Sequence, residues 1–323
     1  MMDLYSKLGG PEMDKWRNKL LRPEFEKNWN RSAPSFANIN VLGKCNADCY
    51  FCLGKDIDPV FAKQNQMRDH FSTWKNFEEF LDVCKARNIP NIYITGQNTD
   101  ALMYRHLGEI LDYVQDRGFR MGLRTNGFLA HKKMDAISKC IANPGFSIHT
   151  RDFETQQLMM GKSPMPDWNK ILTEVDHCRV SIVASRYNIA EIPEMLDWLG
   201  TFPSVQYVQV RRICTDSRED YLIEDARCFD GLLKNIDSEF EQVGEFYAAP
   251  VYRIAGKDVC FWQTVKTDID SVNYFTDGTI SDEYFVIEGY MRESQNYPKL
   301  KGIPINAHGL GLEGYWRPEK VKG

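Results

Sequence analysis

The sequence predicts an α/β fold: a partial (β/α)6 barrel with an N-terminal helical lead-in and a C-terminal extension that contains β-strands. Two observations lead to this prediction. Short apolar runs typical of buried strands alternate about six times with segments whose apolar residues recur at helical spacing. Beyond residue 250 the pattern changes to β-like runs joined by turn residues. Strands that alternate with helices of this length favour a parallel sheet with right-handed crossovers.

The first expected strand is the run Ile39-Asn40-Val41-Leu42, and a loop with three cysteines follows it. The later strands are expected at 90–96, 120–124, 145–149, 180–184 and 205–212. Helices are expected between them, with apolar stripes that begin at Phe77, Leu102, Met134, Ile171 and Ile192, and another follows the sixth strand around Leu232. A closed parallel barrel requires eight such units, so the barrel is expected to be TIM-like but partial.

Several residues mark the ends of these helices. Asn76 and Asp100 stand where side-chain caps are expected at helix N-termini, and Gly118 stands where a left-handed residue ends a helix. Cys84 falls on the apolar stripe of its helix, so it is predicted to be a core residue and not a metal ligand.

The chain divides into three expected regions. Residues 1–37 are read as a helical lead-in that covers the barrel, with a loosely ordered tail as the alternative. Residues 38–215 form the barrel core, and residues 216–323 a helix followed by strands and loops over the barrel mouth, where substrate selection would occur.

Composition limits the classes of function. A net charge of -5 and a pI of about 5.8 argue against a nucleic-acid partner or an anionic membrane surface. No run approaches eighteen apolar residues, and the first residues lack the apolar core of a secretion signal. The 9 cysteines stand mostly singly, which suits a reducing compartment. A soluble, cytoplasmic protein is therefore expected.

The loop after the first strand carries Cys45, Cys49 and Cys52 at C-x-x-x-C-x-x-C spacing. Three close thiolates select zinc, copper(I) or an iron–sulfur cluster. No cysteine follows within the next thirty residues, so one iron of a cubane cluster would stay open for a substrate or cofactor. The alternatives are a zinc ribbon without its second half and three buried cysteines by chance. A ribbon usually presents two C-x-x-C pairs, and this sequence has one.

This spacing, with an aromatic residue before the last cysteine, resembles the signature of the radical S-adenosylmethionine (SAM) superfamily, and the resemblance extends over roughly residues 38 to 215. It implies that the three cysteines hold a single [4Fe-4S] cluster whose fourth iron is chelated by SAM. It also implies that the reduced cluster cleaves SAM to a 5'-deoxyadenosyl radical, which abstracts hydrogen from a substrate. An external one-electron donor such as flavodoxin or ferredoxin would then be required.

The resemblance also suggests which residues contact SAM, because functional groups gather at the carboxyl ends of barrel strands. Phe51 would offer its backbone to the adenine, and Gly96 and Asn98 fall on the stretch that binds the methionine amino group. Only Gly96 matches the usual residue there, and Asp100 could supply the missing charge. The remaining implied cofactor contacts are Thr125, Asn126, Ser147, Lys162, Ser185 and Arg211. By strand alternation only one of Arg211 and Arg212 faces inward, where a substrate anion is the rival ligand.

Three residues are candidates for direct chemistry. His149 would point at the substrate, or serve as a hydrogen-bonded structural histidine. A lone thiol, Cys214 or Cys260, could donate a hydrogen atom to a substrate radical, although a small buried hydrophobe is the ordinary reading.

The expected substrate is a small molecule in natural-product, cofactor or nucleotide and sugar biosynthesis. The expected outcome is rearrangement, epimerisation, decarboxylation, dehydration or oxidation, because no closely spaced cysteine group for an auxiliary cluster follows the barrel. One alternative is a single-cluster enzyme that modifies a peptide or protein. Another, of a different class, is a non-catalytic protein that binds zinc or an iron–sulfur cluster.

Overall fold

The computed structural model of this chain describes residues 36–56, 64–96, 98–161, 164–213, 220–246, 249–262 and 271–281. The strands are β1 (Phe36–Val41), β2 (Asn91–Gly96), β3 (Arg120–Thr125), β4 (Gly145–Ser147), β5 (Cys178–Val183), β6 (Val205–Arg211), β7 (Gln242–Phe246), β8 (Ala249–Ile254), β9 (Lys257–Trp262), β10 (Ser271–Phe275) and β11 (Ile280–Ser281). The α-helices are α3 (Phe77–Ala86), α4 (Leu107–Gln115), α5 (Met134–Ser138), α6 (Phe153–Met160), α7 (Trp168–Glu174), α8 (Ile192–Gly200) and α9 (Asp220–Glu239).

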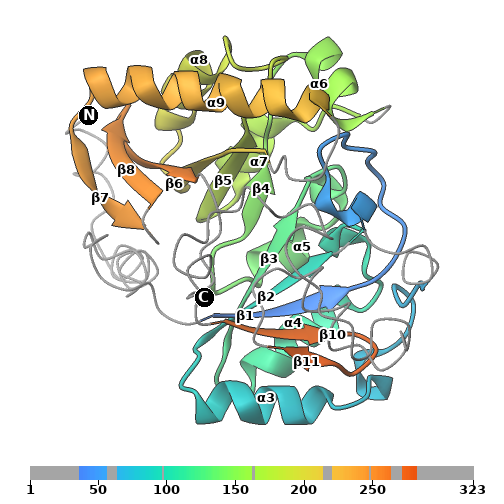
Figure 1. Cartoon of the computed structure of the whole chain (residues 1–323). Coiled ribbons are helices and arrows are strands. Elements are labelled where there is room, and N and C mark those ends of the chain that lie inside the picture. The colour runs from blue at the N-terminus through green and yellow to red at the C-terminus, as the bar shows by residue number, and fades with distance from the viewer. Residues whose placement is uncertain are drawn as a thin grey trace, which may run out of the picture.

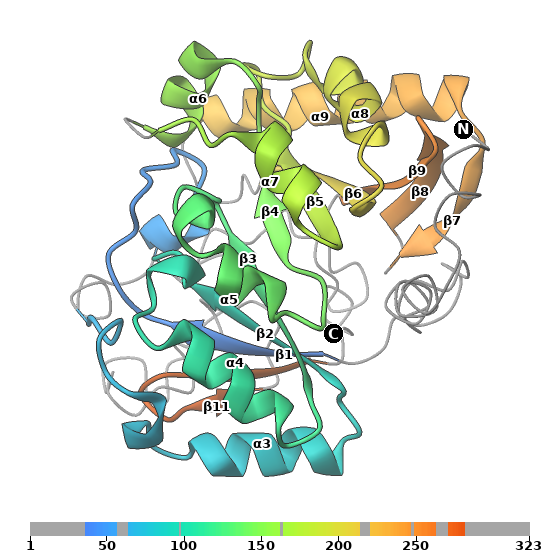
Figure 2. The same cartoon turned by 180° about the vertical axis from the view of Figure 1, so that it is seen from behind.

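The strands form one curved sheet in the order β11-β10-β1-β2-β3-β4-β5-β6-β9-β8-β7. Strands β1 to β6 pair in parallel with their sequence neighbours, as the alternating pattern predicted. The sheet bends around one side without closing, and the helices lie outside it (Figures 1 and 2). The predicted partial, TIM-like α/β barrel is therefore confirmed.

Two strands from the C-terminal part lengthen the parallel sheet at both ends. β10 pairs in parallel with β1, and β9 pairs in parallel with β6. Outside them, β11 pairs with β10 and β8 with β9 in antiparallel fashion. The predicted turn at 276–279 joins β10 to β11, with Gly278 at φ 96. The sheet thus contains two parallel strands, β9 and β10, in addition to the six predicted from the alternating strands and helices.

Each parallel strand sends alternate side chains to opposite faces. Ile92 and Ile94 of β2, for example, join the same hydrophobic core as helix residues such as Phe80 and Leu107. The intervening residues face inward, and they are mostly polar: Asn38, Asn40, Asn91, Tyr93, Arg124, Ser147, Arg179, Ser181, Gln209, Arg211, Asp258 and Cys260. The outer face of the sheet therefore packs against the helices in the apolar core, and the inner face is mostly polar.

Some local predictions need correction. Asp100 caps a 3-10 turn, η4 (Ala101–Met103), and α4 begins only at Leu107, so the predicted single helix is interrupted. The buried Tyr104 is extended there, which ends the turn. Asn76 precedes α3 with φ 56 and makes no cap, because its amide donates to the Gly278 carbonyl instead.

Other predictions agree with the described residues. Gly118 has φ 89, and Cys84 is buried in the core, as expected. β4 stops at Ser147, which leaves His149 in the loop that follows. Residues 1–35 of the predicted lead-in, and residues 282–323, lie outside the described residues. Among the helices that are described, none has the length and apolar character to cross a membrane.

Candidate functional site

The three cysteines lie on a loop that leaves the carboxyl end of β1. The backbone N–H groups of Asp48 and Tyr50 donate to the carbonyls of Met160 and Met159, at 2.9 and 3.2 Å, which fastens the loop to the end of α6. Gly161 follows α6 with φ 74, and a Cβ there would lie 3.0 Å from the Asp48 Cβ. A glycine is therefore needed where the loop crosses the helix end.

The thiols have the surroundings of metal ligands. Burial raises the pKa of Cys45 to about 11, and the charges of Asp100 and Cys52 raise it further. The pKa of Cys49 is also raised by burial and by the other two cysteines. The N–H groups of Ala47 and Gly54 donate to the sulfurs of Cys45 and Cys52 at 3.4 and 3.3 Å. Three close, half-buried sulfurs need a cation to stay ionised, so this set fits an iron–sulfur cluster.

The buried carboxylate of Asp100, which follows β2, connects the end of β3 to the cysteine loop. Asp100 accepts the Thr125 hydroxyl at 2.8 Å and the Asn126 N–H at 2.7 Å, in addition to its capping bond from Leu102. The Asn126 amide then donates to Asn46 at 2.8 Å and lies 3.9 Å from the Cys45 sulfur. Asp100 therefore acts as a joint between β2, β3 and the cysteine loop.

The end of β2 packs against the base of the same loop. The Asn98 side-chain oxygen accepts the Gly43 N–H at 3.2 Å, so this predicted cofactor contact is already engaged within the protein. The Thr99 hydroxyl donates to the Lys44 carbonyl at 3.1 Å. A Cβ on Gly96 would lie 2.1 Å from the Thr99 carbonyl oxygen. Glycine at position 96 is thus required by close backbone approach.

His149 lies in the interior with its ring against Phe51, at 5.2 Å between centroids. Its Nδ1 accepts the Val183 N–H at 3.1 Å. Burial lowers the pKa of His149 to about 3, and the positive charge of Arg211 adds to this effect. The imidazole is therefore neutral, with its proton on Nε2.

The buried His149 predicts a pH dependence of stability. As the pH falls below 6.5, the imidazole of His149 becomes protonated in the unfolded chain but stays neutral in the folded one. The folded state therefore loses stability between pH 6.5 and 3. We expect a loss of about 1 kcal/mol per pH unit below 6.5. Urea unfolding of the wild type and of His149→Gln at pH 7.5 and 5.5 measures it. Equal pH dependence in both proteins would contradict the assignment.

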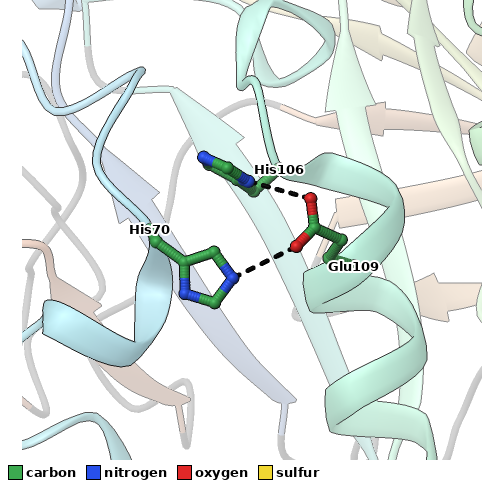
Figure 3. Close-up of side chains that lie close together, drawn as sticks. All are labelled: His70, His106 and Glu109. Carbon is green, nitrogen blue, oxygen red and sulfur yellow. Dashed lines mark hydrogen bonds and ion pairs between the residues drawn. The ribbon is translucent and has the colours of Figure 1, made fainter.

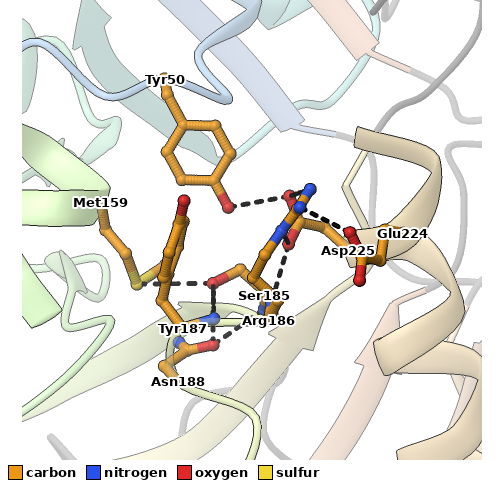
Figure 4. A network of polar contacts seen from close by, with 8 residues as sticks. All are labelled: Tyr50, Met159, Ser185, Arg186, Tyr187, Asn188, Glu224 and Asp225. Carbon is orange, nitrogen blue, oxygen red and sulfur yellow. Dashed lines mark hydrogen bonds and ion pairs between the residues drawn. The ribbon is translucent and has the colours of Figure 1, made fainter. Parts of the chain in front are cut away.

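A second polar network ties the cysteine loop to β5 and α9 (Figure 4). The Tyr50 hydroxyl donates to the fully buried Asp225 carboxylate at 3.0 Å. Asp225 also accepts the backbone N–H and the Nε of Arg186, at 2.7 and 3.0 Å. Ser185 and Asn188 hydrogen-bond to each other beside it. This network positions Tyr50, one of the two residues between Cys49 and Cys52.

Removing the Tyr50 hydroxyl tests the network. Tyr50→Phe leaves Asp225 one donor short, and we expect the free energy of unfolding to fall by about 1 to 2 kcal/mol. Tyr187→Phe is the control, because this ring is 44% exposed, and the expected change is within about 0.5 kcal/mol. Urea unfolding compares the two variants. Equal effects would show that the Tyr50 hydroxyl does not carry the contact.

Arg211, the last residue of β6, and the adjacent Arg212 face opposite sides, as alternation predicted. Arg212 pairs with Asp230 of α9 at 2.8 and 3.1 Å on the outer side. Arg211 is the inward residue, close enough to His149 and Cys260 to influence both electrostatically. Cys260 is 1% exposed in β9, and burial raises the pKa of its thiol to about 12. Lys162 and Cys214 lie outside the described residues.

A separate group of ligand-type side chains lies near η3 (Phe71–Thr73) and the start of α4 (Figure 3). His70 Nε2 and His106 Nδ1 lie 3.1 and 2.8 Å from the two carboxylate oxygens of Glu109. These contacts lower the pKa of Glu109. Because each oxygen already holds one imidazole, the group acts as a clamp between the two segments.

The comparisons with known proteins agree with this geometry. Residues 39–199 match the family model of the Radical SAM superfamily. The chain belongs to the radical SAM superfamily. Its [4Fe-4S] cluster and SAM are the cofactors of that family, and the cysteine loop fits the first of them. No curated protein matches the chain in sequence.

Two solved structures share the fold. The crystal structure of Streptococcus suis SuiB matches 95% of this chain and 70% of its own, with 14% identity and a TM-score of 0.56. The crystal structure of the same protein bound to S-adenosylmethionine matches 85% of this chain, with 15% identity and a TM-score of 0.50. This chain spans 64% of the length of that SAM-bound chain.

Four of the predicted residues that the structure describes lie on or beside the radical SAM loop. Phe51, Asn98 and Asn126 contact the loop or lie on it, and His149 touches Phe51. Sequence reasoning missed Asp225 as a support and treated Tyr50 only as part of the motif. No local pattern could have revealed their contact, because 175 residues separate them.

Proposed function

We propose that this radical SAM enzyme reductively cleaves SAM to a 5'-deoxyadenosyl radical and abstracts hydrogen from a small molecule, in natural-product, cofactor, nucleotide or sugar biosynthesis. The observation that carries the proposal is the loop of Cys45, Cys49 and Cys52, held at the carboxyl end of β1 by α6, β3 and α9. The polar inner face of the sheet adjoins this loop, and it offers groups that can orient a polar substrate.

The residues of the chain have distinct proposed roles. The three cysteines hold the cluster, which when bound supplies the electron for SAM cleavage. Phe51 borders the adenine, while Gly96 and Asn98 form the wall beside the methionine amino group. Thr125, Asn126, Ser147, Lys162, Ser185 and Arg211 contact the remainder of SAM. The neutral His149 borders the substrate space and excludes water from it.

A peptide or protein substrate is the second candidate. β7 is the outermost described strand at one end of the sheet, and Val243 within it is 39% exposed. An extended peptide can add to such an edge by backbone hydrogen bonds. A peptide substrate would therefore pair with Gln242–Phe246, whereas a small molecule would enter the polar interior.

Electron delivery is proposed to occur beside the loop. A cavity of about 430 Å³ is lined by Lys44, Arg68 and Arg105, together with Asn65, Met67 and Met103. Lys44 is exposed and directly precedes Cys45. This basic surface suits an acidic one-electron donor such as flavodoxin or ferredoxin. The cysteines stand mostly singly in the sequence, so a reducing compartment such as the cytoplasm is proposed.

The test is anaerobic reconstitution with iron and sulfide, followed by an assay of 5'-deoxyadenosine from SAM and dithionite. Production that depends on the cluster supports the proposal and justifies a substrate search. A colourless chain that binds one zinc ion and leaves SAM intact would instead support the non-catalytic, metal-binding alternative.

A further inference from the structure

The inner face of the sheet carries an excess of positive charge. Arg124, Arg179 and Arg211 face inward from β3, β5 and β6. Among the inward positions of the described parallel strands, Asp258 of β9 is the single carboxylate. It already pairs with Arg253 of β8 at 2.5 Å. The charge of the other three arginines is therefore not balanced by carboxylates on this face.

Two of these arginines meet over one glycine. Arg124, Gly145 and Arg179 are in register across β3, β4 and β5. A Cβ on Gly145 would lie 2.8 Å from the Arg179 Nε and 2.9 Å from the Arg124 Cδ. Because Gly145 has no side chain, the side chains of Arg124 and Arg179 can both pack over it.

The two guanidinium groups are held differently. Arg124 donates to the Leu123 and Asn143 carbonyls at 3.2 and 3.1 Å and stacks 3.8 Å above the Tyr93 ring. Burial, and then the charge of Arg179, lower the pKa of Arg124 to about 10. Arg179 donates through Nη1 to Gln209 at 3.0 Å, while its buried Nε has no hydrogen-bond partner among the described residues. A buried cationic donor without an acceptor is unfavourable unless a ligand supplies one.

Among the described strand residues, the one inward carboxylate, Asp258, is too far away to accept from the Arg179 Nε. Asp258 occupies the same register row as Arg179, but β6 lies between their strands. Two strand spacings separate them by about 10 Å. The neighbouring Tyr207 and Gln209 are neutral, so these described strands bring no carboxylate to the Arg179 Nε.

The position of the pair relates it to the reaction. Arg124 lies two residues before Asn126, whose amide contacts the cysteine loop. Two residues of strand correspond to roughly 7 Å. A molecule held at the pair can therefore extend toward the loop along the inner face.

We propose that Arg124 and Arg179 form a subsite for an anionic group of the substrate, a carboxylate or a phosphate. The identification of this ligand as the substrate rests on the proposed function. The planar guanidinium groups would donate hydrogen bonds to the oxygens of the anion, and the Nε of Arg179, unpartnered among the described residues, would be one of the donors.

The experiment titrates the full chain, with its cluster reconstituted, by calorimetry at constant ionic strength. Inorganic phosphate and malonate are the two probes, and each is added with and without saturating SAM. We expect one of them to bind in the presence of SAM, and the preferred probe distinguishes phosphate from carboxylate. Arg179→Gln should raise the Kd of the preferred probe about tenfold or more, since one charged hydrogen bond is lost. Arg179→Lys should be affected less.

Arg212→Gln is the matched control, because it removes the same charge from the outer ion pair with Asp230. Its Kd should stay within about twofold of wild type. Should Arg179→Gln not fold, phenylglyoxal labelling of the wild type replaces it, and the bound anion should protect Arg124 and Arg179.

Equal Kd values for Arg179→Gln and Arg212→Gln, or no binding of either probe, would overturn the subsite. Loss of anion binding on addition of SAM would assign the pair to the cofactor carboxylate and also overturn it. Because the titration does not require SAM cleavage, its failure is distinguishable from failure of the proposed function.

Discussion

Alanine substitution at Cys45, Cys49 or Cys52 is expected to reduce 5'-deoxyadenosine production to the background of the cluster-free protein. The physical reason is that each sulfur is one of three protein ligands on the same loop, and two ligands do not hold a cubane cluster. The measurement is the rate of SAM cleavage with dithionite, together with iron and sulfide per chain after reconstitution.

Cys228→Ala is the control for this series. Cys228 is a partly exposed free thiol on α9, outside the loop, so its removal should leave iron content and rate unchanged. Full SAM cleavage by any of the three loop variants would exclude the assigned ligand set. An equal loss in Cys228→Ala would show that the assay responds to thiol chemistry in general.

Asp100→Ala is expected to produce a large loss of stability, although Asp100 lies outside the cysteine loop. It removes the acceptor of three donors, namely the Thr125 hydroxyl and the backbone N–H groups of Leu102 and Asn126. Asp100 is 4% exposed, so water cannot replace it without rearrangement. We expect the free energy of unfolding to fall by at least about 3 kcal/mol. Urea unfolding of the purified protein measures the change.

The same variant should weaken the cysteine loop, because Asp100 holds Asn126 in place and Asn126 holds Asn46. Lower iron retention after reconstitution is the expected second effect. Asp82→Ala, on the exposed side of α3, is the matched control and should change stability by no more than about 0.5 kcal/mol. A similar small change in Asp100→Ala would mean that its carboxylate is dispensable.

The sequence determined the features that depend on local pattern. Helical spacing and short apolar runs predicted the six parallel strands, because one face of each must join an apolar core. The cysteine spacing predicted the ligand loop, since thiolates close in the chain are close in space. Alternation correctly predicted that only one of Arg211 and Arg212 faces inward, and the structure shows that it is Arg211.

Local pattern was less reliable where tertiary contacts decide. Asp100 was predicted both as a helix cap and as a candidate charge for SAM. It is a cap, but its other contacts come from β3, which the sequence alone does not bring near it. Asn76 failed as a cap because the Gly278 carbonyl, distant in sequence, takes its amide.

The tertiary structure alone placed β9 and β10 at the two ends of the parallel sheet, since these pairings join segments far apart in the chain. It alone joined Tyr50 to Asp225 and brought Arg124 and Arg179 together over Gly145. Residue type and spacing determined which side chains could bind iron and anions. The register between strands determined which of these side chains lie next to one another. Register is set by packing between strands and not by the order of residues within them.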